Sequence, residues 1–284
     1  MPSGARSNEE RVKAEWMDEA TALAWRRWHD KSERFWSELT DAMLGIALLE
    51  PGHRVLDLAS GTGDPALTFA PLVEPGRIVL TDLSPQMVKI ARENADRAGV
   101  RNASFEVADA HALHYPDSSF DRVTCRLGVM YFWDCGKALR EVRRVLKPGG
   151  IAAFAAWGAP ERNEYIDAAL APFKARSPMP EPAPDTPQPY RFCKPGSLGA
   201  ELTAAGFTGV DEETRNLRLA WPGPAEELWR RLYEVSAPLR PYFDSFAPQE
   251  REAAAREAVA NLSKLSKGGE VSARADIVLA SACR

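Results

Sequence analysis

The sequence has 284 residues, of which 45% are hydrophobic and 27% charged, with 36 basic and 40 acidic side chains. This composition is typical of a folded chain of one large or two small domains, and it excludes disorder throughout. The slight acidity argues against nucleic acid as an obligate partner. No apolar run approaches the ~20 residues of a membrane span, and the first residues lack the hydrophobic segment of a secretory signal.

The four cysteines are scattered along the chain, at Cys125, Cys135, Cys193 and Cys283. They are too few and too scattered for a disulfide framework, and they lack the short Cys-x-x-Cys pair of a zinc site. We therefore expect a reduced, cytoplasmic protein without a metal, present as a monomer or homodimer. The eight tryptophans are the unusual number in the composition.

Residues 1–50 alternate charged side chains with large apolar ones, many of them three, four or seven positions apart. Such spacing predicts amphipathic helices. Pro51-Gly52 ends the pattern.

From residue 53 to about 157, short aliphatic runs alternate with helical stretches. The predicted strands are 54–58, 77–81, 104–107, 120–125 and 151–157, and the predicted helices begin near Asp64, Ser84 and Lys137. Strands separated by helices predict a doubly wound parallel sheet. Beyond it we expect a proline-rich loop over 176–190, a helix over 195–206, a strand over 209–220, helix over 225–265 and a strand over 273–280.

The loop Gly61-Thr-Gly63-Asp-Pro-Ala66 lies at the first strand-to-helix turn, where ligands of open α/β sheets bind. Taken alone, it also matches the G-x-G-x-x-A pattern of dinucleotide-binding folds, with Asp82 as the ribose acid. Asp57 and Asp64 lie on either side of the turn, and two carboxylates there would repel a pyrophosphate. They favour a ligand that carries cationic groups, and S-adenosylmethionine (SAM), with an ammonium and a sulfonium, meets that condition.

An ordered series of motifs resembles class I SAM-dependent methyltransferases, in the branch of the UbiE/COQ5 quinone methyltransferases. The series comprises Val55–Asp64, Asp82–Met87, Ala108–Ala110, Phe120–Val123 and Leu146–Gly150. The resemblance implies a Rossmann-like α/β fold with a seven-stranded sheet whose last pair is antiparallel. The resemblance covers roughly residues 50–160, and we expect a methyltransferase domain over 51–284. The aromatic, helical segment 1–50 is expected to act as a lid over the site. Residues 160–195 and 222–268 would be cap insertions.

The resemblance also implies roles for individual residues. Asp57 would hold the methionyl ammonium, directly or through water, and the backbone of Ala59, Gly61 and Gly63 would line the methionine and ribose. Asp82 would accept from the ribose hydroxyls, with Leu83 and Met87 against the adenine. Further along the chain, Asp109 and Ala110 would meet the adenine edge, and Arg126 and Leu127 the methionine end.

The sequence says less about the residues that contact the methyl acceptor than about those that bind SAM. A general base is needed only where the acceptor must lose a proton, and the weak candidates are His29, His111 and Tyr131, with His114 as a further histidine near the adenine acid. Tryptophans are expected to form the acceptor pocket: Trp25, Trp28, Trp36, Trp133 and Trp157. No cluster of acids suited to a metal-dependent reaction is evident.

The expected activity is methyl transfer from SAM to an oxygen, nitrogen or carbon of a small organic acceptor. Two alternatives stay open from the sequence. One is an NAD(P)-dependent oxidoreductase that uses the Gly61–Gly63 loop, and the other is a non-catalytic SAM-binding protein.

Overall fold

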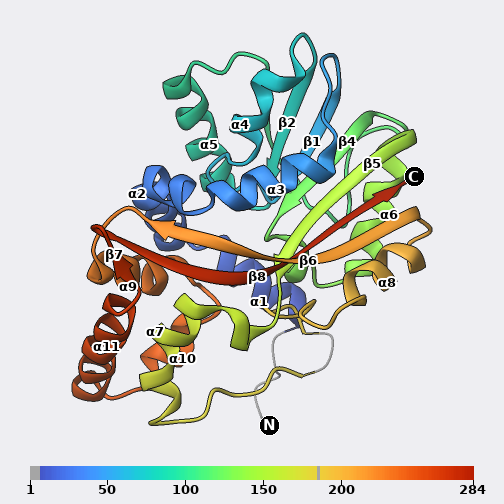
Figure 1. The fold of residues 1–284 in the computed structure, drawn as a ribbon. Coiled ribbons are helices and arrows are strands. Elements are labelled where there is room, and N and C mark those ends of the chain that lie inside the picture. The colour runs from blue at the N-terminus through green and yellow to red at the C-terminus, as the bar shows by residue number, and fades with distance from the viewer. Residues whose placement is uncertain (1–6, 184–185) are drawn as a thin grey trace.

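The computed structural model describes residues 7–183 and 186–284 and is built on one sheet (Figure 1). Its strands follow the order β3-β2-β1-β4-β5-β8-β6. The first five strands are parallel: β1 Arg54–Leu58, β2 Arg77–Asp82, β3 Ala103–Val107, β4 Phe120–Arg126 and β5 Leu146–Trp157. In the central β1, Val55, Leu56 and Leu58 are buried, as expected of a strand covered on both faces.

Two long antiparallel strands complete the sheet. β8 (Glu270–Cys283) runs antiparallel to both β5 and β6 (Thr208–Trp221), and the two-residue β7 (Ser266–Lys267) pairs with β8. The predicted seven-stranded, doubly wound topology is therefore confirmed. The additional strand β7 was not predicted, because a strand of two residues has no recognisable sequence pattern.

Among the helices between the parallel strands, α5 (Pro85–Ala98) begins and ends where its capping residues predict. It is capped by Ser84, whose hydroxyl accepts from the Met87 amide, and it ends at Gly99 with a φ of 72°. The helix after the glycine loop is much shorter than expected: α4 (Ala66–Phe69) passes directly into the 3-10 turn η1 (Ala70–Val73). α6 covers Cys135–Val145, after the 3-10 turn η2 (Val129–Tyr131).

The N-terminal segment forms three helices: α1 Asn8–Trp16, α2 Glu19–Phe35 and α3 Ser37–Ala47. α2 is capped by Asp18 and packs against α5, α9 and β6. Edge-on ring contacts join Phe35 to Tyr165 and Trp221, with centroids 5.2 and 6.0 Å apart. The segment predicted to be a lid is thus packed onto the second half of the chain.

The C-terminal additions differ in part from the sequence expectation. Residues 225–265, expected to be helical throughout, form three helices: α9 Ala225–Val235, α10 Arg240–Asp244 and α11 Pro248–Ser263. Pro238, Pro241 and Pro248 lie at the interruptions and explain them. The structure also contains η3 (Pro160–Arg162) and α7 (Glu164–Lys174), which were not predicted individually, and α8 (Ser197–Ala204), which was.

Figure 1 shows α7, α9, α10 and α11 gathered on one side of the molecule, whereas α4 and α5 lie beside β1 and β2. Within the described parts of residues 176–190 there is no helix or strand, as the prolines predict. None of the described helices combines the length and apolarity needed to cross a membrane.

Candidate functional site

A large cavity opens at the carboxyl ends of β1, β2 and β4 and encloses about 1540 Å³ of empty space, part of it open to solvent. We call its two sides the strand-end half and the cap half. The strand-end half is lined from the sheet, mainly by Ala59, Gly61, Asp82, Leu83, Asp109, Ala110, Arg126 and Leu127. The cap half is lined from the flanking helices and loops, mainly by Trp16, Trp25, Glu33, Trp36, Tyr165, Tyr190 and Arg231.

Asp82, at the end of β2, is held by the backbone on both carboxylate oxygens. Oδ2 accepts from the Gly61 amide and Oδ1 from the Ser84 amide, each at 2.9 Å. Burial raises the pKa of Asp82 in spite of these bonds. Each carboxylate oxygen can accept more than one hydrogen bond, so the fixed carboxylate retains capacity for a ligand with two hydroxyls, such as a ribose.

The glycine loop approaches Asp82 through backbone of positive φ, 52° at Ala59 and 53° at Gly61. Both residues line the cavity, whereas Gly63 does not. A Cβ at Gly63 would lie 2.6 Å from Leu67 Cδ1 and 3.6 Å from the Ala91 Cα. This glycine permits close packing of the loop against α4 and α5, and its predicted place beside the ligand stays a prediction.

Asp57 is buried under the loop and is not on the cavity wall. Its Oδ1 accepts from Thr124 Oγ1 at 2.5 Å, and its Oδ2 has no hydrogen-bond partner among the described residues. Burial raises the pKa of Asp57 to about 6, against the hydrogen bonds from Thr124 and Ser60. This position suits only the water-mediated form of the predicted contact with an ammonium group.

Asp109 and His111 form a fixed pair at the edge of the cavity. Asp109 Oδ1 accepts from the His111 amide at 2.8 Å and lies 2.6 Å from His111 Nδ1. Partial burial acts to raise the pKa of Asp109, but the hydrogen bonds from His111 outweigh it and lower the pKa. His111 stacks on Trp133 at 3.7 Å between ring centroids. The predicted adenine acid is thus held in its ionised form beside an aromatic wall.

Arg126 lies in the cavity wall and links the two halves. Its Nη2 donates to the Asp64 carbonyl at 2.8 Å and lies 3.2 Å from Glu33 Oε1, while Nη1 donates to Thr40 Oγ1 at 2.9 Å. Nη1 also donates to Glu33 Oε2 at 3.4 Å, so the guanidinium makes four contacts to other described residues. Its predicted role at the methionine end is compatible with this place in the wall and stays a prediction.

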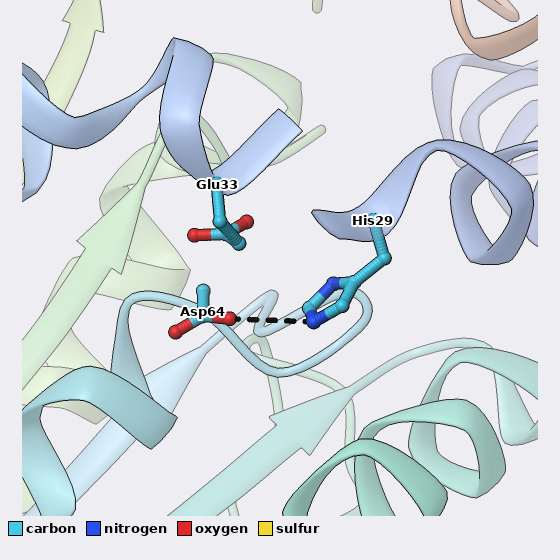
Figure 2. A group of neighbouring side chains, drawn as sticks. All are labelled: His29, Glu33 and Asp64. Atoms are coloured by element: carbon cyan, nitrogen blue, oxygen red, sulfur yellow. Dashed lines mark ion pairs between the residues drawn. The ribbon is translucent and has the colours of Figure 1, made fainter. Parts of the chain in front are cut away.

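Figure 2 shows Glu33 and His29 of α2 facing Asp64 of the glycine loop. Each offers a ligand atom within 4.8 Å of the others, a set of donors that suits a divalent cation by residue type. The expectation that no such cluster exists near the site is therefore wrong. The guanidinium of Arg126 already places a positive charge against Glu33 and the Asp64 carbonyl, so part of the cluster's negative charge is neutralised by the chain itself.

The structure disfavours the three predicted bases. His29 does not line the cavity, and its Nδ1 lies 3.0 Å from Thr62 Oγ1 while its Nε2 faces Asp64 at 3.6 Å. His111 lines the cavity, but Asp109 engages Nδ1 and the Asp134 amide donates to Nε2 at 3.3 Å. Tyr131 lines it too, with a pKa that burial raises strongly. His114 is exposed beside Glu106, 2.8 Å from its Oε2.

Four of the five predicted pocket tryptophans line the cavity: Trp25, Trp36, Trp133 and Trp157. Trp28 does not, which corrects the expectation. Its indole Nε1 donates to Glu234 Oε2 at 2.8 Å, and its ring packs edge-on against Trp221 at 5.7 Å. Trp28 therefore joins α2 to α9 and β6 and contributes to packing.

Among the cavity residues that the sequence did not predict are Trp16, Glu33 and Arg231. Arg231 falls three residues after Leu228 and four before Val235, on the apolar face of α9. Glu33 is four residues after His29 and three before Trp36. Both Arg231 and Glu33 could have been predicted as site residues, because each is a charged residue on an otherwise apolar helix face.

Comparisons with known proteins agree with this geometry. Residues 55–150 match the family model described as "Methyltransferase domain". Over 132 residues the chain is 41% identical to the ubiquinone/menaquinone biosynthesis C-methyltransferase UbiE of Pseudoalteromonas translucida, covering 46% of this chain and 51% of that protein. UbiE of Shewanella sp. (strain ANA-3) is 44% identical over 119 residues, which cover 41% of this chain and 46% of that protein. The chain thus spans about half the length of these curated relatives.

Solved structures extend the similarity of fold beyond that segment. The YcgJ protein of Bacillus subtilis has a TM-score of 0.56 at 24% identity, with 86% of this chain and 97% of that chain covered. The [4+2]-cyclase SpnF has a TM-score of 0.55 at 25% identity, with 87% and 80% covered. One of these two proteins is named a cyclase, so similarity of fold does not by itself define the reaction.

The sheet order and the matched segment define residues 55–150 as a class I SAM-dependent methyltransferase domain with a Rossmann-like fold. Within that class, the segment is similar to UbiE, at 41–44% identity over 119–132 residues. The resemblance inferred from the motif series is confirmed.

Proposed function

We propose that the chain transfers a methyl group from SAM to an oxygen, nitrogen or carbon atom of a small organic acceptor. The observation that carries the proposal is the Asp82 carboxylate, fixed by two backbone amides inside a cavity that continues into an aromatic cap half. In the strand-end half, Asp82 would bind the ribose and Asp109 the adenine edge. Asp57 would attract the ammonium group through water.

The cavity residues would act mainly by positioning the reactants and excluding water. When bound, SAM supplies an electrophilic methyl group on a sulfonium leaving group, so alignment of the acceptor atom gives most of the acceleration. Trp25, Trp36 and Trp157 would enclose the acceptor. In this proposal residues 1–50 act as the lid, and the insertions 160–195 and 222–268 cap the domain over 51–284.

Glu33 is the side chain best suited to remove a proton from the acceptor. It lines the cavity, and burial raises its pKa to about 7, although the Arg126 charge acts to lower it. A carboxylate with a pKa near the working pH is an efficient general base. This favours acceptors that lose a proton on methylation, such as phenols or activated carbon acids.

The proposal is tested by titrating S-adenosylhomocysteine (SAH) and NAD⁺ separately into the protein and following heat release. We expect saturable SAH binding and none for NAD⁺. The protein is then incubated with SAM and a panel of phenols, hydroquinones and aromatic acids, and SAH release is measured. Binding of NAD⁺ alone would favour the oxidoreductase, and SAH binding without turnover of any acceptor would favour a non-catalytic SAM-binding protein. Cytoplasmic location, a monomeric or homodimeric state and independence of nucleic acid stay predictions.

A further inference from the structure

Arg231 of α9 is a buried guanidinium that faces the cavity. The residue is 1% exposed, lines the cap half, and donates from Nε to Ser32 Oγ at 2.9 Å. Its Nη2 is buried and has no hydrogen-bond partner among the described residues. An unpaired donor in such a place costs free energy unless a ligand completes it.

Aromatic rings surround this guanidinium. Its Cζ lies 5.3–5.8 Å from the ring centroids of Trp25, Phe35, Trp36 and Trp221. Cation–π attraction stabilises the charge there, yet the rings accept no conventional hydrogen bond from Nη2. Trp25 and Trp36 also line the cavity, so one wall presents a positive charge flanked by two indole rings.

The ionisable groups that face Arg231 come from three elements and leave its charge unmatched. Glu33 of α2 attracts it and Arg126 of β4 repels it, while the neutral Tyr165 hydroxyl of α7 stabilises it as a hydrogen-bond acceptor only. Glu33 is already engaged by Arg126 at 3.2 Å. Within residues 7–183 and 186–284, no carboxylate lies within 4.0 Å of Arg231 to form an ion pair, although desolvating a lone charge is costly.

We propose that Arg231 anchors a carboxylate of the acceptor, and that the acceptor is a planar aromatic carboxylic acid. The planar guanidinium suits a carboxylate geometrically, and the adjoining indoles of Trp25 and Trp36 suit an aromatic ring. The inference rests on the proposed function, because it assigns the substrate class of the same cavity. It places the anion at the cap half, opposite the acidic strand-end half.

The test compares two probes of equal shape, 2-naphthoate and the neutral 2-naphthamide, by calorimetric titration with and without saturating SAH. We expect the wild-type protein to bind naphthoate at least about tenfold more tightly, the effect of one charge-assisted hydrogen bond. Arg231→Gln should abolish that preference, and Arg231→Lys should keep part of it. Arg230→Gln is the matched control, because Arg230 is an exposed neighbour over Trp28, outside the cavity, and should leave the preference unchanged.

Equal affinity of the wild-type protein for the two probes would overturn the proposal, and this measurement needs no variant to fold. A loss of SAH affinity in Arg231→Gln, with the naphthoate preference retained, would also overturn it, because the anion would then be the carboxylate of the cofactor. Failure of SAH to bind the wild-type protein would contradict the proposed function instead. The probe titration without SAH would still report on Arg231 in that case.

Discussion

The two halves of the cavity satisfy their buried polar groups in different ways. In the strand-end half, Asp82 is fixed by the Gly61 and Ser84 amides, and Asp109 by His111. In the cap half, Glu33 has a raised pKa and Arg231 has an unpaired Nη2. In the half proposed to bind SAM, nearby backbone amides therefore satisfy the buried carboxylates. The half that would meet the acceptor keeps hydrogen-bonding capacity for it.

This difference predicts the largest change for Glu33→Gln, which removes the proposed base without changing side-chain size. Turnover of a phenolic or carbon-acid acceptor should fall about 100-fold, the lower end of general-base contributions. The wild-type rate should rise with pH up to an apparent pKa near 7, because Glu33 must be ionised to accept a proton, and the variant should lack that rise.

The measurement is SAH release between pH 5.5 and 9. Glu38→Gln is the control, since Glu38 pairs with Arg218 in an exposed position. A Glu33→Gln enzyme with wild-type rates across this range would remove Glu33 from the reaction.

Asp82→Ala should lower SAH affinity about 10- to 100-fold, because charge-assisted hydrogen bonds to the ribose contribute about 1.5–3 kcal/mol each. Calorimetric titration of SAH gives the affinity. Asp96 is an exposed acid on α5, so the control variant Asp96→Ala should leave the SAH affinity unchanged. Unchanged affinity in the Asp82 variant would show that the ribose lies elsewhere.

Asp57→Asn should lower SAH affinity about tenfold at pH 7.5, since one charge interaction through water is lost. Burial raises the pKa of Asp57 to about 6, so the ionised, binding-competent form prevails above that pH. The wild-type affinity should therefore decline as the pH falls through 6, and the variant should show no such decline. A pH-independent wild-type affinity between 5 and 7.5 would contradict this role.

Gly63→Ala should have the smallest effect on ligand binding and act on stability instead. The added methyl group would meet Leu67 at 2.6 Å, at a φ of 122°, which should cost about 1–3 kcal/mol in free energy of unfolding. Gly45→Ala is the matched control in α3, where nothing lies within 4 Å, and should stabilise by up to about 1 kcal/mol. Urea unfolding measures the free energy of unfolding of both variants. A Gly63→Ala protein as stable as the wild type would contradict the packing role of Gly63.

Much of the fold followed from the sequence because local signals agreed with one another. Aliphatic runs at 54–58 and 77–81, Ser84 as a helix cap and Gly99 as a helix stop each predicted an element that the structure contains. The antiparallel arrangement of the last two long strands, β6 and β8, followed from the family resemblance. The insertion of β8 between β5 and β6 was not predicted. Pro238, Pro241 and Pro248 mark the breaks between α9, α10 and α11, which the prediction of a helix over 225–265 did not include.

The site was predictable where its residues are neighbours of the motifs, as with Ala59, Gly61, Asp82 and Asp109. It was not predictable where long-range packing decides which way a side chain points. Trp28 turns toward Glu234, 206 residues away in the chain, and Arg231 reaches Ser32 across 199 residues. Contacts between residues so far apart in the chain cannot be predicted from local sequence. The sequence shows them only indirectly, here as a charged residue on an apolar helix face.

The most direct test of the two-half cavity is a crystal structure of the protein with SAH. We expect the ribose hydroxyls within hydrogen-bond distance of Asp82, the adenine beside Asp109, and the sulfur facing the cap half that contains Trp25, Trp36 and Arg231. A ribose bound away from Asp82, or a sulfur facing away from the cap half, would contradict it.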